Sequence, residues 1–290
     1  MTQAYSPRVL IVGCGDVGNE LGRQLLKNGY DVWGMRRNTA CLAPGITPVQ
    51  GDFNEPASWQ RLPLGLDYLV FTGAANERSD AGYRQTYVEG LKAMIAAATA
   101  LDKPPRRLLF TSSTAVYHQG NGVWVDESSA TQPQAFNGQR MLEAEQLLAS
   151  STLLSTSVRF SGIYGPGRER LIQRAQNGQG CEYLPAPITN RVHRDDCAGI
   201  LSHLIQRDWQ GKEVAPLYIG SDSEPCAMDE VLDWLAKQLG VELSVTEKRP
   251  CSIPSKRCSN QRLLETGYRF LYPDFRAGYG ALLEQRAAKG

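Results

Sequence analysis

The stretch Arg8-Val-Leu-Ile-Val-Gly-Cys-Gly-Asp-Val-Gly18 decides the fold of this chain. Its first five residues form a short β-branched and aliphatic run, which predicts a buried strand. Gly13, Gly15 and Gly18 follow at the spacing GxGxxG, and the apolar residues after them recur as one face of a helix. A strand, a glycine-rich turn and a helix in this order predict a dinucleotide-binding unit.

Each glycine has a separate task in such a turn. Gly13 makes the tight turn, Gly15 lets backbone approach a pyrophosphate, and Gly18 lets the helix lie close to the strand. The helix N-terminus adds free N–H groups and a positive dipole end, which favour phosphate. We therefore predict phosphate contacts along the loop and the first helical turn, from Gly13, Cys14, Gly15, Asp16, Val17 and Gly18.

Composition and charge limit the class of protein. The formal net charge is +1 and 42% of the residues are hydrophobic, so no long-range field would recruit nucleic acid or an anionic membrane. No apolar run reaches the ~20 residues that span a bilayer, and residues 1–7 are too short and polar for a signal peptide. We expect a cytoplasmic protein with a small-molecule substrate and neither nucleic-acid nor membrane partners, with a homodimer left open.

The cysteines and histidines do not predict a metal site. Seven cysteines and three histidines are scattered along the chain, and no C-x-x-C occurs, so a zinc site is not expected. An odd number of cysteines in a cytoplasmic chain predicts buried or free thiols.

Predicted strands alternate with predicted helices along the chain. We expect strands at 8–12, 30–35, 47–50, 67–71, 107–111 and 155–160, and helices at 81–101, 139–149, 195–206 and 228–239. Such alternation implies parallel pairing, so the fold class is α/β, a Rossmann-type doubly wound parallel sheet. Ligands of this architecture bind at the carboxyl ends of the strands.

Two domains are expected. Residues 1–160 form the dinucleotide-binding domain, and residues 161–290 form a smaller C-terminal substrate lobe, because the regular alternation stops after Phe160. Residues 215–220 predict a strand that can rejoin the sheet of the first domain. The expected strand ends carry Gly13, Arg36, Asp52, Gly73 and Ser113.

Five motifs make the chain resemble the extended short-chain dehydrogenase/reductase superfamily, in its NAD-dependent epimerase/dehydratase branch. They are the GxGxxG turn, Gly51-Asp52-Phe53, Phe110-Thr-Ser-Ser-Thr-Ala-Val-Tyr117, Arg159-Phe-Ser-Gly-Ile-Tyr-Gly-Pro-Gly167 and Val192-His-Arg-Asp-Asp196. The resemblance implies an NAD(P)-dependent oxidoreductase, epimerase or dehydratase that acts on a nucleotide sugar or a related carbonyl or hydroxyl substrate.

The chain departs from that family at the catalytic centre. The family's serine corresponds to Ser113, but its Tyr-x-x-x-Lys corresponds to Phe136 and Arg140, and no Tyr-x-x-x-Lys occurs anywhere in the chain. A phenyl ring has no ionisable proton, and an arginine cannot act as an acid or base at neutral pH. Arg140 retains a positive charge and donors that could bind the nicotinamide ribose. The resemblance therefore leaves the proton donor unidentified.

The end of the second predicted strand indicates the cofactor. An acidic residue there would bind the ribose 2′-hydroxyl of NAD, but the chain has Arg36 and Arg37, which can pair with a 2′-phosphate. This favours NADP(H), with NAD(H) as the alternative. The resemblance assigns the adenine contact to Asp52 and Phe53, and we expect the strand end Thr72-Gly73-Ala74 to contact the cofactor as well.

Several residues are candidates for substrate binding or proton transfer. Ser113, Arg159, Tyr164, Arg168 and His193 are candidate substrate contacts, and Tyr117 or His118 could replace the missing proton donor. Two functions remain open at this point. The protein is either an enzyme with a non-standard active site or a sensor or scaffold that binds NADP(H) without turnover.

Overall fold

The computed structural model describes residues 5–245, 247–251 and 254–288, and they divide into two compact units. The first unit contains the chain up to Val116 together with Thr131–Arg159 and Cys197–Tyr218. The second contains Tyr117–Ala130, Phe160–Asp196 and the chain from Ile219 onward. The units therefore interleave along the chain, whereas the sequence suggested a boundary near residue 160 with only residues 215–220 returning to the sheet of the first domain, as β12 does.

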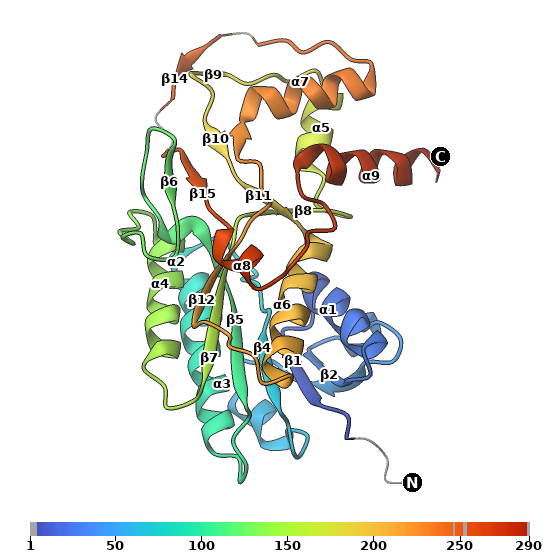
Figure 1. Ribbon diagram of the computed structural model, residues 1–290, viewed down its shortest axis with the longest axis vertical. Coiled ribbons are helices and arrows are strands. Elements are labelled where there is room, and N and C mark those ends of the chain that lie inside the picture. Colours follow the sequence, from blue (N-terminus) through green and yellow to red (C-terminus); the bar gives the residue numbers. More distant parts are fainter. Residues whose placement is uncertain (1–4, 246, 252–253, 289–290) are drawn as a thin grey trace. The chain divides into compact units, whose positions relative to one another are not determined.

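A seven-stranded sheet is the centre of the first unit (Figure 1). Its strand order is β3-β2-β1-β4-β5-β7-β12, and the ladders from β3 to β5 are all parallel. The strands are β1 (Arg8–Val12), β2 (Asp31–Arg36), β3 (Thr47–Gln50), β4 (Tyr68–Phe71), β5 (Arg107–Ser113), β7 (Ser155–Phe160) and β12 (Leu217–Gly220). The Rossmann-type fold is confirmed, and the strand order reverses between β1 and β4, where this fold binds its ligands.

Helices flank both sides of this sheet. Figure 1 shows α3 (Gly90–Thr99) and α4 (Phe136–Ala149) on one side, and α1 (Asp16–Lys27) and α6 (Arg194–Trp209) on the other. Strands β1 and β4 are buried on both faces, as continuous apolar runs at a sheet centre should be. The short segments η1 (Thr39–Cys41), η2 (Pro56–Arg61) and η4 (Thr114–Val116) link these elements.

The long helix expected at 81–101 is a composite. It begins as α2 (Asp80–Tyr83), widens into a π-helical segment, η3 (Arg84–Glu89), and continues as α3. The helix expected at 139–149 begins three residues earlier, at Phe136, because Ala135 is the extended residue before the first turn. Phe136 is therefore the first residue of α4 and lies at the N-terminal end of that helix.

The second unit is built around its own apolar core. Buried side chains from α5 (Arg170–Gln176), α7 (Met228–Leu239) and α9 (Phe275–Ala287) pack together there, among them Ile172, Val231, Leu235 and Phe275. The short helix α8 (Gln261–Glu265) belongs to the same unit. Four two-stranded ladders complete it, formed by β8 (Gly162–Tyr164) with β11 (Arg191–His193), β6 (Val123–Val125) with β15 (Lys256–Cys258), β9 (Tyr183–Leu184) with β14 (Arg249–Pro250), and β10 (Ile188–Thr189) with β13 (Cys226–Ala227).

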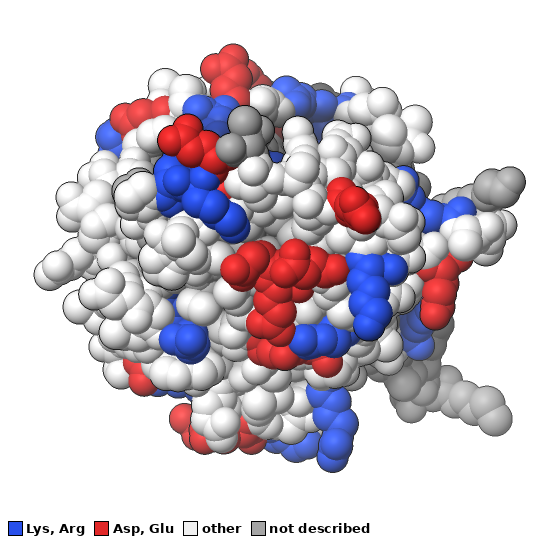
Figure 2. All heavy atoms as spheres, turned by 90° about the horizontal axis from the view of Figure 1, so that it is seen from above, with Lys and Arg blue, Asp and Glu red and all other residues white. Residues whose placement is uncertain are grey.

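Charge is mixed on the face of the molecule drawn in Figure 2. Acidic and basic side chains lie there in small neighbouring groups separated by uncharged surface. None of the helices in the described ranges has the length and apolar character needed to cross a bilayer. All seven cysteines lie in those ranges and none of them forms a disulfide there, and no group of metal-ligating side chains occurs among the described residues.

Candidate active site

Two glycines of the turn, Gly13 and Gly18, are required by packing within the folded chain. Gly13 has φ +71°, and a Cβ added there would lie 2.4 Å from the Cα of Gly73. A Cβ at Gly18 would lie 2.8 Å from Oγ1 of Thr72. Both positions therefore require glycine for packing alone, because neither neighbour leaves space for a side chain.

Gly15 differs from these two glycines. A Cβ added there would meet only the carbonyl oxygen of Gly13, at 3.7 Å, which is an ordinary contact. Gly15 is also the N-cap of α1, and no side chain caps the N–H groups of this turn. The structure thus leaves the space beside Gly15 open at the start of α1, which is the space that a pyrophosphate occupies in this fold.

Backbone hydrogen bonds hold the turn beside the end of β2. The amides of Gly13 and Cys14 both donate to the carbonyl of Met35, at 3.0 Å. Cys14 is fully buried, and burial raises the pKa of its thiol to about 12. The thiol therefore stays protonated and serves as a small packed side chain in the turn.

Arg36 and Arg37, the two arginines predicted to select the cofactor, make different contacts. Arg36 Nη1 donates to the carbonyl of Cys14 at 3.1 Å, which brings its guanidinium onto the glycine turn. Arg37 is more exposed, donates to Oδ1 of Asn76 at 3.0 Å and lies 3.8 Å from the carboxylate of Asp52. Arg36 is therefore the arginine that the structure places beside the predicted phosphate site.

Asp52 and Phe53 lie at the same end of the sheet. Oδ1 of Asp52 accepts a hydrogen bond from the amide of Asn54, which leaves the second oxygen facing Arg37. The ring of Phe53 packs edge-on against Phe71 with centroids 5.2 Å apart, and it also lies 3.1 Å from a Cβ placed on Gly73. Phe53 thus closes the sheet end by packing, in addition to the adenine contact that we predict.

Ser113 ends β5 and Tyr117 follows it, and the two side chains have different surroundings. Oγ of Ser113 accepts from the amide of Ala115 at 3.1 Å, and the side chain is partly exposed. The phenol of Tyr117 donates to the carbonyl of Asp126 at 2.7 Å, and the residue is 3% exposed. Because the phenol is buried and its proton is bonded to Asp126, a residue of the second unit, we do not propose Tyr117 as the proton donor. His118, the other candidate, is exposed.

Phe136 and Arg140 occupy the places of the family's tyrosine and lysine on α4. The Phe136 ring meets the Tyr83 ring edge to face, with centroids 5.4 Å apart and an interplanar angle of 88°. Arg140 donates to both oxygens of Asp80, at 2.7 and 2.9 Å, and to Glu143 at 2.7 Å. The hydrogen bonds to Asp80 and Glu143 raise the pKa of Arg140 above its usual value, so Arg140 remains a cation. Its ion pair with Asp80 connects α4 to α2. Its predicted contact with the nicotinamide ribose stays a prediction.

The structure gives Arg159 a structural role in place of the predicted substrate contact. Its guanidinium lies inside the first unit, where Nη2 and Nε bond the Glu145 carboxylate at 2.6 and 2.9 Å. Oγ of Ser112 donates to the same carboxylate at 2.5 Å. The side chains of Arg159 and Glu145 are only 6% and 9% exposed. Sequence spacing could not pair them, because α4 and β7 meet only in the folded chain.

The predicted substrate residues of the second unit are mostly buried. His193 is 2% exposed, accepts from the amide of Asp195 through Nδ1, and packs between the rings of Tyr164 and Tyr272. Burial raises the pKa of Tyr164, which is 4% exposed. Arg168 is exposed in the loop before α5. Of this group, only Arg168 presents its side chain to solvent.

Sequence reasoning missed a buried polar cluster near these residues. Arg191 is 4% exposed and contacts the sulfur of Cys226 at 3.0 Å. Asp222 is 1% exposed, and burial raises the pKa of its carboxyl group to about 8. Only its Oδ1 accepts a hydrogen bond from a described residue. No sequence signal marks these residues, because isolated charged residues in loops are normally exposed.

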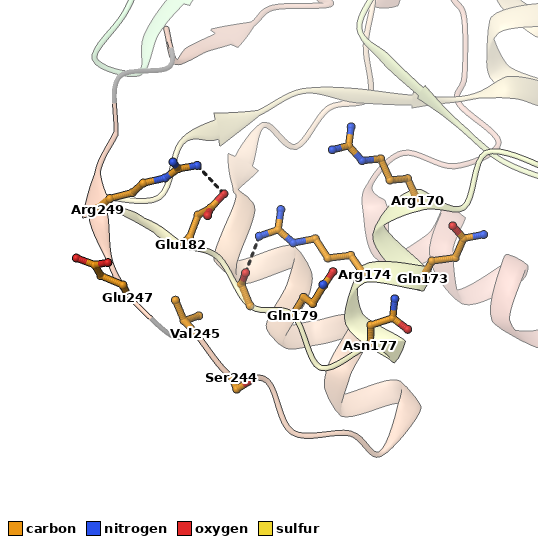
Figure 3. A pocket seen from close by; sticks show the side chains of 11 residues that line it. Arg170, Gln173, Arg174, Asn177, Gln179, Glu182, Ser244, Val245, Glu247 and Arg249 are labelled. Atoms are coloured by element: carbon orange, nitrogen blue, oxygen red, sulfur yellow. Dashed lines mark hydrogen bonds and ion pairs between the residues drawn. The ribbon is translucent and has the colours of Figure 1, made fainter.

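A polar cavity of about 740 Å³ lies in the second unit. In Figure 3, the guanidinium groups of Arg170 and Arg174 point into this space from α5, and that of Arg249 points into it from the opposite wall. Arg249 pairs with Glu182 at 2.9 Å, and Arg174 donates to the carbonyl of Gly180. Arg170 has no such contact with a described residue, so its charge is available to a ligand. The volume is in the range of small-molecule sites.

Comparison with known proteins identifies the family. A family model described as NAD(P)H-binding matches residues 13–208. A solved structure from Methylobacillus flagellatus, described provisionally as an NAD-dependent epimerase/dehydratase, is 37% identical, with a TM-score of 0.83 over 98% of this chain and 100% of that one. The chain belongs to the NAD(P)H-binding epimerase/dehydratase family, within the extended short-chain dehydrogenases/reductases.

Two further solved structures share the fold at lower sequence identity. The Bordetella bronchiseptica enzyme WbmG, solved with NAD and UDP, is 20% identical with a TM-score of 0.79 over 99% of this chain and 96% of that one. The human epimerase family protein SDR39U1, solved with NADPH, is 20% identical, with a TM-score of 0.76 over 93% of this chain and 97% of that one. Members of this fold have thus been solved with each cofactor.

Proposed function

We propose that this protein is an NADPH-preferring oxidoreductase of the epimerase/dehydratase type, acting on a carbonyl or hydroxyl carbon of a nucleotide sugar. The observation that carries the proposal is the open space at Gly15 with the Arg36 guanidinium beside it. The turn accepts a pyrophosphate, and a guanidinium pairs with a 2′-phosphate in two-pronged geometry. The NADPH complex of SDR39U1 supports this preference by analogy of fold.

The chain's own residues can perform a limited chemistry at this site. When bound, a nicotinamide cofactor supplies or accepts a hydride. Gly13 and Gly18 shape the turn, and Ser113 offers a hydroxyl that can orient a substrate oxygen. Phe136 cannot move a proton, so the proton must come from another side chain.

The arginine-lined cavity is our candidate for the anionic part of the substrate. A diphosphate would receive charge-assisted hydrogen bonds from Arg170 and Arg174, which are among the strongest in proteins. WbmG, a protein of the same fold, has been solved with UDP, and this supports a nucleoside diphosphate as the ligand class.

Calorimetric titration with UDP tests this assignment. We expect Arg170→Gln to weaken UDP binding about 10–100-fold, because a hydrogen bond to a charged group contributes ~1.5–3 kcal/mol. Arg269→Gln is the matched control, since Arg269 is an exposed arginine of the same unit that does not line the cavity. If Arg170→Gln binds UDP as the wild type does, the cavity is not the diphosphate site.

Turnover is tested directly by following NADPH absorbance at 340 nm with a panel of nucleotide sugars and their 4-keto derivatives. Hydride transfer to or from one of them supports the proposal. A second candidate, a sensor that binds NADP(H) without turnover, is favoured by Phe136 at the position of the catalytic tyrosine. Tight NADPH binding without oxidation by any member of the panel would favour that candidate.

A further inference from the structure

Tyr83 brings a phenol to the place where α4 lacks one. It is the last residue of α2, and its ring packs edge-on against Phe136, with centroids 5.4 Å apart. Phe136 stands where the family carries its proton-transferring tyrosine. The two rings come from helices separated by more than 50 residues along the chain, so the phenol arrives from a different element.

The contact between Tyr83 and Phe136 is held in place on both sides. One turn before Tyr83, Asp80 forms a two-pronged ion pair with Arg140, which lies one turn after Phe136 on α4. The start of α2 is fixed by Ser79, whose side chain accepts from the amide of Gly82 at 3.1 Å. Arg140 thus fastens the helix that carries Tyr83 to the helix that carries Phe136.

The hydroxyl group of Tyr83 is available for a substrate. The hydroxyl groups of Tyr5, Tyr68 and Tyr117 each donate to a carboxylate or carbonyl oxygen. Tyr83 is partly exposed, and its hydroxyl bonds to no residue in the described part of the chain. The π-helical segment η3 begins at the next residue, and such segments occur often at functional sites.

We propose that Tyr83 is the proton donor that replaces the missing tyrosine of α4. The inference rests on the proposed function and names the residue that completes it. In the reducing direction, the Tyr83 O–H bond would break and its proton would move to the substrate carbonyl oxygen, while the carbonyl carbon would receive the hydride that NADPH supplies, so that an alcohol and NADP+ result. The resulting phenolate recovers a proton from water. In the oxidising direction the Tyr83 oxygen, as the phenolate, would accept the proton of the alcohol, while the hydride of the alcohol carbon would pass to NADP+.

A chemical-modification experiment tests where Tyr83 lies without requiring turnover. The full-length protein is treated with tetranitromethane, with and without saturating NADPH, and nitration of each tyrosine is followed by mass spectrometry. We expect NADPH to slow nitration of Tyr83 at least fivefold. Tyr5, which is 57% exposed, is the internal control and should react equally in both samples. Nitration of Tyr83 that is indifferent to NADPH would overturn the inference.

Kinetics then test the chemical role with the substrate that gives turnover. We expect Tyr83→Phe to slow hydride transfer ~10²–10⁴-fold, as is typical for loss of a general acid, with NADPH affinity unchanged. The double variant Tyr83→Phe/Phe136→Tyr, which moves the phenol back to α4, should transfer hydride at least tenfold faster than Tyr83→Phe. A Tyr83→Phe variant with wild-type rates would overturn the inference while leaving the proposed function intact. A wild type inactive on the whole panel would instead refute the proposed function, and the nitration result would still decide the position of Tyr83.

Discussion

Replacing Gly15 by valine should separate cofactor binding from folding, and Gly13→Ala provides the matched comparison. At Gly15 a new Cβ meets only the Gly13 carbonyl oxygen, at 3.7 Å, so the folded chain accepts it. The branched side chain would then fill the space that we assign to the pyrophosphate. At Gly13 a Cβ would lie 2.4 Å from the Cα of Gly73, and the new residue would have to adopt φ +71°.

These geometries set the expected magnitudes. Left-handed backbone costs a non-glycine residue ~1–2 kcal/mol and overpacking costs a further ~1–3 kcal/mol, so Gly13→Ala should lose about 2–5 kcal/mol of stability. Gly15→Val should lose clearly less. Losing two hydrogen bonds to charged phosphate oxygens, at ~1.5–3 kcal/mol each, should weaken NADPH binding by Gly15→Val about 10²–10⁴-fold.

The assay pairs denaturant unfolding with an NADPH titration followed by calorimetry, on the wild type and both variants. The expected pattern is a stable Gly15→Val that fails to bind and a destabilised Gly13→Ala. Wild-type affinity in Gly15→Val would show that the turn does not hold the phosphates. A loss of stability in Gly15→Val as large as that in Gly13→Ala would refute the separation of the two roles.

Three further outcomes are expected. The wild type should bind NADPH more tightly than NADH by about 1–3 kcal/mol, and Arg36→Ala should remove that preference; equal affinities of the wild type in parallel calorimetric titrations would contradict it. Arg159→Met should cost about 3–5 kcal/mol in urea unfolding, because it strands the buried Glu145 carboxylate, and the double variant Arg159→Met/Glu145→Leu should recover much of the loss. The folded-state pKa of Asp222, raised by burial to about 8, lies above its unfolded value of ~4, so the folded chain keeps a proton that the unfolded chain releases and stability should fall as pH rises from about 4 to 8. Asp222→Asn should remove this pH dependence. Thermal unfolding at several pH values from 5 to 8 should therefore show the stability of the variant rising relative to that of the wild type. Parallel pH profiles of the two proteins would count against a neutral buried carboxyl group.

The sequence alone predicted the sheet and the end of it where the cofactor is expected. The turn at Gly13, Gly15 and Gly18 is a local backbone requirement, and such requirements are written into neighbouring residues. The same holds for the buried strands, whose apolar runs mark β1 and β4 without reference to the rest of the chain. The absence of Tyr-x-x-x-Lys was equally plain, since a missing side chain needs no structure to be noticed.

The tertiary structure decided which polar groups face a ligand and which are used inside the protein. Arg159, Tyr117 and His193 resembled site residues in the sequence, yet each is buried against a partner that lies on another element. Conversely, Tyr83 carried no signal until the helix beginning at Asp80 packed on α4 and placed its ring beside Phe136. The physical reason is that hydrogen bonds, ion pairs and ring contacts act over a few ångströms in space, and chain separation does not encode which distant side chains will meet.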